Sequence, residues 1–276
     1  MALGLEGCRF DYAAADAGEW LRELEITAHG RLGVAALDTR TQAIVVYRAE
    51  ERFPMCSTVK LMIAGAVLRH AMNDDSLLSR RIEYDDSDLA VYAPVTGKQE
   101  DRALTVAQLC AATLQYSDNA AANLLLRLIG GLSGVNSFAR GIGDQTFRLD
   151  RLEPELNSAI PGDERDTTSP LAMMRSTYRL LLGDALGSAQ REQLRAWMRG
   201  NTTGDKRIRA GVPDGWGVAD KTGTGPYGTT NDVGVLWPPT GAPLVLAIYF
   251  THPDPDAAPG DEIIAAATRQ VVGRLR

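Results

Sequence analysis

Apolar residues form strand-like runs near both ends of the chain. Runs at 32–37 and 43–47 favour strands, and the polar segment 38–42 between them predicts a hairpin. After a long middle region, the chain returns to the same kind of pattern. We expect three more strands there, at 216–222, 232–236 and 244–251.

Helical patterns fill the middle of the chain and begin and end it. The segment 16–29 predicts an amphipathic helix whose apolar face includes Trp20 and Leu21, and 261–275 predicts a last helix. The segment 58–70 is apolar almost throughout, which indicates a buried helix. Further helices are expected at 105–115, 120–129, 170–182 and 188–199.

This order of elements favours an α/β fold of the α+β type. The simplest packing is one antiparallel sheet built from both chain ends and flanked by helices, with an all-helical domain inserted between its second and third strands. We place the sheet domain at 1–50 plus 205–276 and the helical domain at 51–204. A functional site is then expected in the cleft between the two domains.

The composition is that of an ordinary soluble protein, with 45% hydrophobic and 23% charged residues among 276. The net charge is −6 and no run of basic residues occurs, so neither nucleic acid nor an anionic membrane is an expected partner. The longest apolar stretch, 61–68, is too short to span a membrane. The first 30 residues carry several acids and no apolar core, so we expect no signal peptide in them. The protein is then either cytosolic or a form from which the signal has been removed.

Cysteine and histidine usage argues against metal and cofactor chemistry. Cys8, Cys56 and Cys110 are odd in number and form no CxxC, and the three histidines are scattered. A metal site or a Ser-His-Asp triad is therefore not expected. The stretch from Gly223 to Gly228 matches GxGxxG, but a proline and a strand follow it instead of the helix that a dinucleotide site needs.

Ser57 and Lys60 form an S-x-x-K motif at the start of the apolar helix. Residues at i and i+3 share one helical face, so the hydroxyl and the amine can touch. Lys60 is the one charge in its apolar segment, and burial would lower its pKa until it could take a proton from the serine. Taken alone, the pattern is short enough to arise by chance.

Two further triplets have both a chemical and a plainer interpretation. In Ser117-Asp-Asn119, the serine could relay a proton and the asparagine could donate an amide hydrogen bond, but a helix N-cap also explains the triplet. Lys-Thr-Gly at 221–223 ends a predicted strand and offers a charge, a hydroxyl and an approachable backbone. A strand end with a solvated lysine is the plainer explanation.

In this order, S-x-x-K, S-D-N and K-T-G resemble the known motif set of the class A serine β-lactamases. A fourth segment is similar to the Ω-loop of that family. Glu153 matches the deacylating base, and Asn157 matches the residue that helps to hold the hydrolytic water. Arg151 and Asp166 match an ion pair at the neck of the loop. The i, i+4 spacing of Glu153 and Asn157 agrees, because one helical turn would aim both at one water.

The resemblance extends to the substrate pocket. Tyr92 resembles the aromatic wall of the cleft. Arg207 resembles an arginine that reaches Lys221 in some members and helps to bind the substrate carboxylate. The strand 229–236 has no arginine, so Arg207 is the only candidate for this second cation. The implied carboxylate site consists of Lys221, Thr222 and Thr224, with Arg207 behind them.

The same resemblance implies the reaction. Ser57 attacks the β-lactam carbonyl, whose oxygen is bound by the backbone N–H groups of Ser57 and Thr224. Ser117 passes a proton to the leaving nitrogen, and Glu153 then activates a water. Whether Lys60 or Glu153 removes the serine proton is open for this family. No metal or cofactor is needed.

The implied partners are β-lactams and inhibitors such as clavulanate, with the enzyme a monomer that is periplasmic or secreted. Some members have a disulfide where this chain has Cys56 and Gly225, so that bridge is not expected. A D-Ala-D-Ala peptidase shares the first three motifs but lacks the Glu153–Asn157 pair. A β-lactam receptor would deacylate slowly and be tethered to a membrane segment. Turnover of a chromogenic cephalosporin distinguishes the three.

Overall fold

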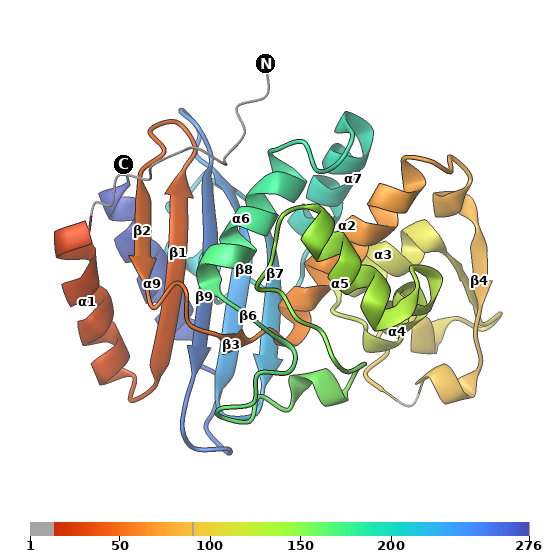
Figure 1. Cartoon of the computed structure of the whole chain (residues 1–276), viewed down its shortest axis with the longest axis horizontal. Coiled ribbons are helices and arrows are strands. Elements are labelled where there is room, and N and C mark those ends of the chain that lie inside the picture. The colour runs from red at the N-terminus through yellow and green to blue at the C-terminus, as the bar shows by residue number, and fades with distance from the viewer. Residues whose placement is uncertain (1–13, 90, 276) are drawn as a thin grey trace.

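The computed structural model describes residues 14–89 and 91–275, and a five-stranded sheet lies at its centre (Figure 1). The strand order is β2-β1-β9-β8-β7, and all neighbours are antiparallel. The N-terminal and the C-terminal parts of the chain both contribute strands to this sheet, as the apolar runs predicted. The strands are β1 (Arg31–Asp38), β2 (Ile44–Tyr47), β7 (Gly217–Gly225), β8 (Thr229–Trp237) and β9 (Leu244–Thr251).

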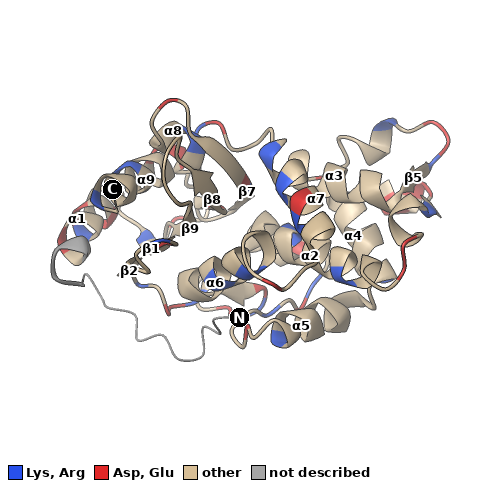
Figure 2. Ribbon diagram, turned by 90° about the horizontal axis from the view of Figure 1, so that it is seen from above, with Lys and Arg blue, Asp and Glu red and all other residues tan. Residues whose placement is uncertain are grey.

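Helices cover both faces of this sheet. On one face lie α1 (Ala14–Thr27), α9 (Asp261–Arg274) and the short α8 (Ile208–Gly211), while α6 (Pro170–Leu181) packs against the other (Figure 2). Successive residues of β1 belong alternately to the two hydrophobic clusters, because side chains alternate along a strand. This two-sided burial explains why β1 is apolar at nearly every position.

The helical part packs around α2 (Val59–Ala71), which is buried along its length except at Arg69 and His70. A helix that is apolar on all sides is stable only inside a protein, and α2 is surrounded by other helices. The sequence analysis expected most of these helices but did not predict α5. They are α3 (Val106–Gln115), α4 (Asn119–Leu128), α5 (Gly131–Gly141) and α7 (Ser188–Arg199).

Short elements that the sequence analysis did not predict join the helices to the sheet. β3 (Phe53–Pro54) pairs with β6 (Thr167–Thr168), and the N–H of Met55 donates to the carbonyl of Asp166 at 2.9 Å. This pairing brings the segment before Ser57 against the end of the segment 151–168, which resembles the Ω-loop. The others are β4 (Arg81–Glu83), β5 (Ala103–Thr105) and the 3-10 turns η2 (Cys56–Thr58), η3 (Leu77–Ser79), η4 (Asp86–Leu89), η5 (Thr96–Lys98) and η6 (Glu155–Asn157).

The division into 1–50 plus 205–276 and 51–204 stays a prediction. All five strands of the main sheet fall in the first set, but α6, from the second set, packs on β1, β8 and β9. Charges of both signs are distributed over the sheet part and the helical part (Figure 2). Across the described ranges, no helix has the length and apolar character that a membrane span requires.

Candidate active site

The candidate nucleophile, Ser57, lies in η2 directly before α2. Its Oγ accepts a hydrogen bond of 2.9 Å from Lys60 Nζ, so the two residues touch as their spacing predicted. Both residues are buried. The preceding residue, Cys56, has a φ of 45°, which is uncommon for a residue other than glycine and is found more often at functional sites.

Lys60 Nζ connects four of the candidate residues. Besides Ser57, it lies 3.0 Å from Glu153 Oε1 and donates to Asn119 Oδ1 at 2.5 Å. It also donates to Ser117, to the carbonyl at 2.8 Å and to Oγ at 3.2 Å. Burial lowers the pKa of Lys60, and the negative charge of Glu153 opposes that shift. A buried amine that touches the nucleophile is suited to move a proton to or from it.

Asp118 fixes the backbone between Ser117 and Asn119. Its Oδ1 caps α4 by accepting the N–H of Ala121 at 2.9 Å, and its Oδ2 accepts two N–H bonds of 2.9 Å from the start of η5. The N-cap interpretation of the triplet is therefore confirmed for Asp118, and the chemical interpretation of Ser117 and Asn119 stays a prediction. Asp118 is the N-cap, while Ser117 and Asn119 bond to Lys60.

Glu153 is held at its side chain and at its backbone. Asn157 Nδ2 donates to Glu153 Oε2 at 2.5 Å. Asn123, on α4, donates to the carbonyl of Glu153 at 3.0 Å and accepts its N–H at 3.1 Å. The sequence analysis missed Asn123. A signal was available, because Asn123 follows Asn119 by one helical turn and so lies on the same face of α4.

The neck of the Ω-loop is closed by the expected ion pair. Arg151 Nε lies 2.5 Å from Asp166 Oδ2. Asp166 is buried, and its Oδ1 also accepts the N–H groups of Asp150 at 2.7 Å and Arg151 at 2.9 Å. A buried carboxylate needs such donors to offset its lost hydration. The pair therefore fixes both ends of the segment that carries Glu153.

The end of β7 forms the opposite wall. Lys221 is fully buried, and its Nζ donates to Ser117 Oγ at 3.2 Å and to the carbonyl of Thr222 at 2.9 Å. Burial and the nearby charge of Lys60 lower the pKa of Lys221 to about 7. Ser117 Oγ thus lies between two lysines, which suits it to relay a proton.

Two residues allow β7 and β8 to approach the nucleophile. A Cβ on Gly223 would lie 2.6 Å from the carbonyl of Met55 and 3.2 Å from the N of Ser57, so only glycine permits this contact. Asn231, on β8, donates to the carbonyls of Pro54 at 2.8 Å and Met55 at 3.1 Å. Asn231 was also missed, because its partners lie far away in the sequence and no local pattern marks it.

Arg207 reaches the wall from the loop before α8. Its Nη2 donates to Thr224 Oγ1 at 2.7 Å, its Nη1 donates to one carbonyl of β7 and one of β8 at 2.9 Å each, and its Nε pairs with Asp261 at 2.7 Å. Among the described residues, none of these bonds reaches Lys221. None is expected, because an ammonium and a guanidinium both only donate, and the charge of Arg207 is close enough to help lower the pKa of Lys221.

These walls enclose a cleft of about 370 Å³. Lys60, Glu153 and Lys221 lie behind its lining, each bonded to a residue that lines it. Tyr92 is 61% exposed at the rim. The structure thus gathers all the candidate residues at one place. The lining consists of Ser57, Tyr92, Ser117, Asn119, Asn157, Thr203, Arg207, Thr222, Thr224, Gly225 and Pro226.

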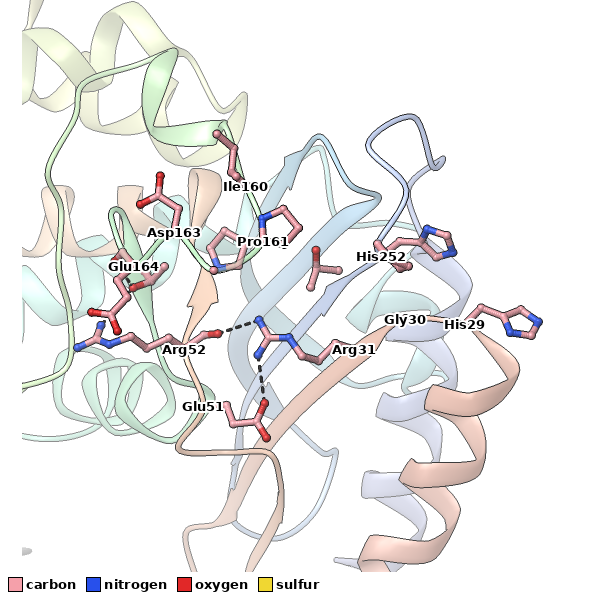
Figure 3. A pocket seen from close by; sticks show the side chains of 16 residues that line it. His29, Gly30, Arg31, Glu51, Arg52, Ile160, Pro161, Asp163, Glu164 and His252 are labelled. Atoms are coloured by element: carbon pink, nitrogen blue, oxygen red, sulfur yellow. Dashed lines mark hydrogen bonds and ion pairs between the residues drawn. The ribbon is translucent and has the colours of Figure 1, made fainter.

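A larger hollow, of about 730 Å³, lies away from this chemistry, between the Ω-loop and one end of the sheet (Figure 3). Arg31 donates there to Glu51 at 3.2 Å and to the carbonyl of Arg52 at 2.8 Å. No candidate site residue lines this hollow. We therefore place the active site in the smaller cleft.

The two described cysteines are free, as expected. Cys56 and Cys110 are both buried, and Cys8 lies outside the described residues. A Cβ on Gly225 would lie 2.9 Å from Cys56 Sγ, so these positions are close in space but not bridged. The GxGxxG stretch that begins at Gly223 runs from the end of β7 into β8, not into a helix.

Comparisons with known proteins agree over most of the chain. Residues 18–275 match the model of a family described as "Beta-lactamase enzyme family". A β-lactamase of Citrobacter koseri is 55% identical over 92% of this chain and 87% of that protein. The β-lactamase OXY-2 of Klebsiella oxytoca is 53% identical, over 96% and 91%. A solved structure of a β-lactamase from Desulfarculus baarsii superposes with a TM-score of 0.92 at 52% identity, covering 94% of this chain and 97% of that one.

Proposed function

Because the chain belongs to the β-lactamase enzyme family, as a class A member, we propose that the residues gathered around Lys60 carry out its reaction, with Ser57 as the nucleophile. The enzyme hydrolyses the β-lactam amide of penicillins and cephalosporins through a serine acyl-enzyme and so confers resistance. The observation that carries the assignment is the unbroken contact from Ser57 Oγ through Lys60 Nζ to Glu153 Oε1, at 2.9 Å and 3.0 Å.

Acylation begins at Ser57 and its contact with Lys60. Ser57 Oγ attacks the carbonyl, and the developing oxyanion is bound by the N–H groups of Ser57 and Thr224, at about 3–4 kcal/mol per donor. The serine proton leaves along the path that joins Ser57, Lys60 and Glu153. Ser117, in contact with Lys60, delivers a proton to the β-lactam nitrogen as the ring opens.

Deacylation begins at Glu153, at the other end of these contacts. Glu153 takes a proton from a water, which attacks the ester and releases Ser57. Asn157 supports this role, because its Nδ2 bonds to Glu153 and its buried Oδ1 has no partner among the described residues. That oxygen can accept a hydrogen bond from the same water. This pair distinguishes a hydrolase from a peptidase or receptor that stops at the ester.

The substrate carboxylate is held at the end of β7. Lys221 and Arg207 supply positive charge, and Thr222 and Thr224 supply hydroxyl groups in the cleft. Asn119 bonds the substrate side-chain amide, and Tyr92 packs beside it at the rim. Clavulanate, a β-lactam with the same carboxylate, acylates Ser57 in this pocket. No metal or cofactor takes part.

We also propose that the protein acts as a monomer in the periplasm or outside the cell, where its substrates meet it. A fusion of the chain to an exported leader should protect cells against ampicillin. The same chain retained in the cytoplasm should protect them less.

The proposal is tested by turnover of a chromogenic cephalosporin. The wild-type protein should complete many cycles per active site, and Ser57→Ala should complete none. A single burst of one product per enzyme, with no later turnover, would favour the receptor or the peptidase instead.

A further inference from the structure

Beside the end of β7, where the substrate carboxylate is proposed to bind, four side chains form a hydrogen-bonded row. Asn201 Nδ2 bonds to Asp220 Oδ2 at 2.6 Å, and both residues are buried. Asn201 Oδ1 lies 2.7 Å from Thr203 Oγ1, which lies 2.5 Å from Thr222 Oγ1. The row therefore runs from a buried carboxyl group to a hydroxyl that lines the cleft.

The direction of each hydrogen bond in this row is fixed. Asn201 Oδ1 accepts the backbone N–H of Thr203 at 3.0 Å, so its amide is oriented with the oxygen toward Thr203. An amide oxygen only accepts, so the hydroxyl of Thr203 must donate to it. Thr203 then has no proton left for its contact with Thr222. Thr222 must donate to Thr203, so its proton is already engaged in a hydrogen bond.

Thr224 has the opposite orientation. Its Oγ1 accepts a hydrogen bond of 2.7 Å from Arg207 Nη2, and a guanidinium only donates. The hydroxyl proton of Thr224 is therefore available, and Thr224 is an exposed residue of the cleft lining. The ion pair of Arg207 with Asp261, at 2.7 Å, keeps the guanidinium in this position.

We propose that Asn201 and Thr203 are positioning residues, which turn the hydroxyl proton of Thr222 away from the bound carboxylate and leave Thr224 as the hydroxyl donor. The inference rests on the proposed function, since it concerns the same carboxylate pocket. Binding a carboxylate at Thr222 requires its proton to turn toward the ligand, and the hydrogen bond from Thr222 to Thr203 is then lost. The row thus weakens one of two chemically similar contacts and sets which threonine recognises the substrate.

The test is Thr203→Val, which removes the acceptor for the Thr222 proton. Thr203 is exposed, so the change buries nothing. Benzylpenicilloate, the hydrolysed product, keeps the carboxylate and forms no ester, and its dissociation constant can be measured by calorimetry without turnover. We expect Thr203→Val to bind it about three- to tenfold more tightly, the size of one ordinary hydrogen bond. Thr203→Ser keeps the hydroxyl and should bind like the wild type.

A double variant distinguishes this effect from a general loosening of the loop. With Thr222→Val already present, Thr203→Val should give no further gain, since no proton remains to be turned. A gain that persists in the double variant, or weaker or unchanged binding in Thr203→Val, would overturn the inference. Turnover of benzylpenicillin by the wild type is measured alongside. If the wild type does not turn over benzylpenicillin, both the proposed function and the inference are refuted. If it does, but the variants do not bind benzylpenicilloate as expected, the inference alone is refuted.

Discussion

At the scale of single residues, two buried lysines determine the electrostatics of the cleft. Lys60 touches Glu153, whereas the hydrogen-bond partners of Lys221 among the described residues are a hydroxyl and a carbonyl. Burial lowers the pKa of both, and for Lys221 to about 7. In the proposed mechanism, the same side chain therefore serves as a proton carrier at one position and as a titratable anchor at the other.

The pKa of Lys221 predicts how activity depends on pH. The charged form exists below pH 7 and is lost as the pH rises, so kcat/KM for benzylpenicillin should fall along an alkaline limb with an apparent pKa of about 7. An arginine stays charged throughout this range. In Lys221→Arg, the limb should therefore move above about pH 9. A limb that stays in place in this variant would assign the titration to another group.

Removal of Arg207 tests the second cation. Arg207→Ala should lower kcat/KM for penicillins about tenfold or more, mostly through KM, and should weaken inactivation by clavulanate. Lys206→Ala removes an exposed neighbouring charge and is the matched control. Equal effects of the two variants would show that only net charge matters.

The four motifs could be predicted from the sequence because each is local. Asn123 could have been predicted from its spacing of one helical turn to Asn119, whereas Asn231 and Thr203 could not, although each fixes a part of the site. Asn231 and Thr203 bond to groups on other elements, and such a role depends on packing that no short pattern encodes.

At the scale of elements, strongly patterned segments were predictable and weakly patterned ones were not. The apolar helix α2 was expected at 58–70 and is observed at Val59–Ala71. The helix α5 was missed because its glycine-rich start is typical of a loop. It forms because Val135 and Ala139, one turn apart, are buried against the core, so tertiary contacts outweigh the low helix propensity of glycine.

The Ω-loop carries the prediction at this scale. Arg151→Ser leaves the carboxylate of Asp166 buried without its ion pair, which costs about 1–3 kcal/mol and should lower the melting temperature by about 2–5 °C. A looser loop should also raise turnover of ceftazidime relative to benzylpenicillin.

The control is Arg165→Ser, in the same loop. Arg165 pairs with Asp163, and its side chain is 49% exposed. This variant should leave both the melting temperature and the substrate ratio close to the wild type. If Arg151→Ser behaves in the same way, the ion pair does not hold the loop.

At the scale of the whole molecule, strands from the N-terminal and C-terminal parts of the chain form one open sheet. The proposed active site lies where β7 meets the helical part. The strand order places β1 beside β9, so backbone hydrogen bonds join the N-terminal and C-terminal parts of the sheet. The sequence indicated that both ends supply strands. It did not indicate the pairing order, because register depends on contacts between segments some 200 residues apart.

The reactivity of the cysteine thiols tests whether the interior is packed as the structure shows. Burial raises the pKa of the thiols of Cys56 and Cys110, so neither should react with Ellman's reagent in the native protein. The denatured, unreduced chain should show three free thiols, Cys8 included. A count of one would reveal a disulfide.

The central claim is that Ser57 makes the ester and that Glu153 supplies the water that breaks it. A carboxylate base contributes about 10²–10⁴-fold to such a step, so Glu153→Ala should be acylated but hardly turn over. Glu155→Ala, which removes an exposed carboxylate two residues away, is the control and should turn over normally.

The direct measurement is the mass of each protein after mixing with benzylpenicillin. Glu153→Ala should gain one penicilloyl group on the peptide that contains Ser57 and keep it for minutes or longer. The wild type and Glu155→Ala should show no lasting adduct, and Ser57→Ala should never gain the mass. Wild-type turnover by Glu153→Ala, or a lasting adduct on the wild type itself, would contradict the account.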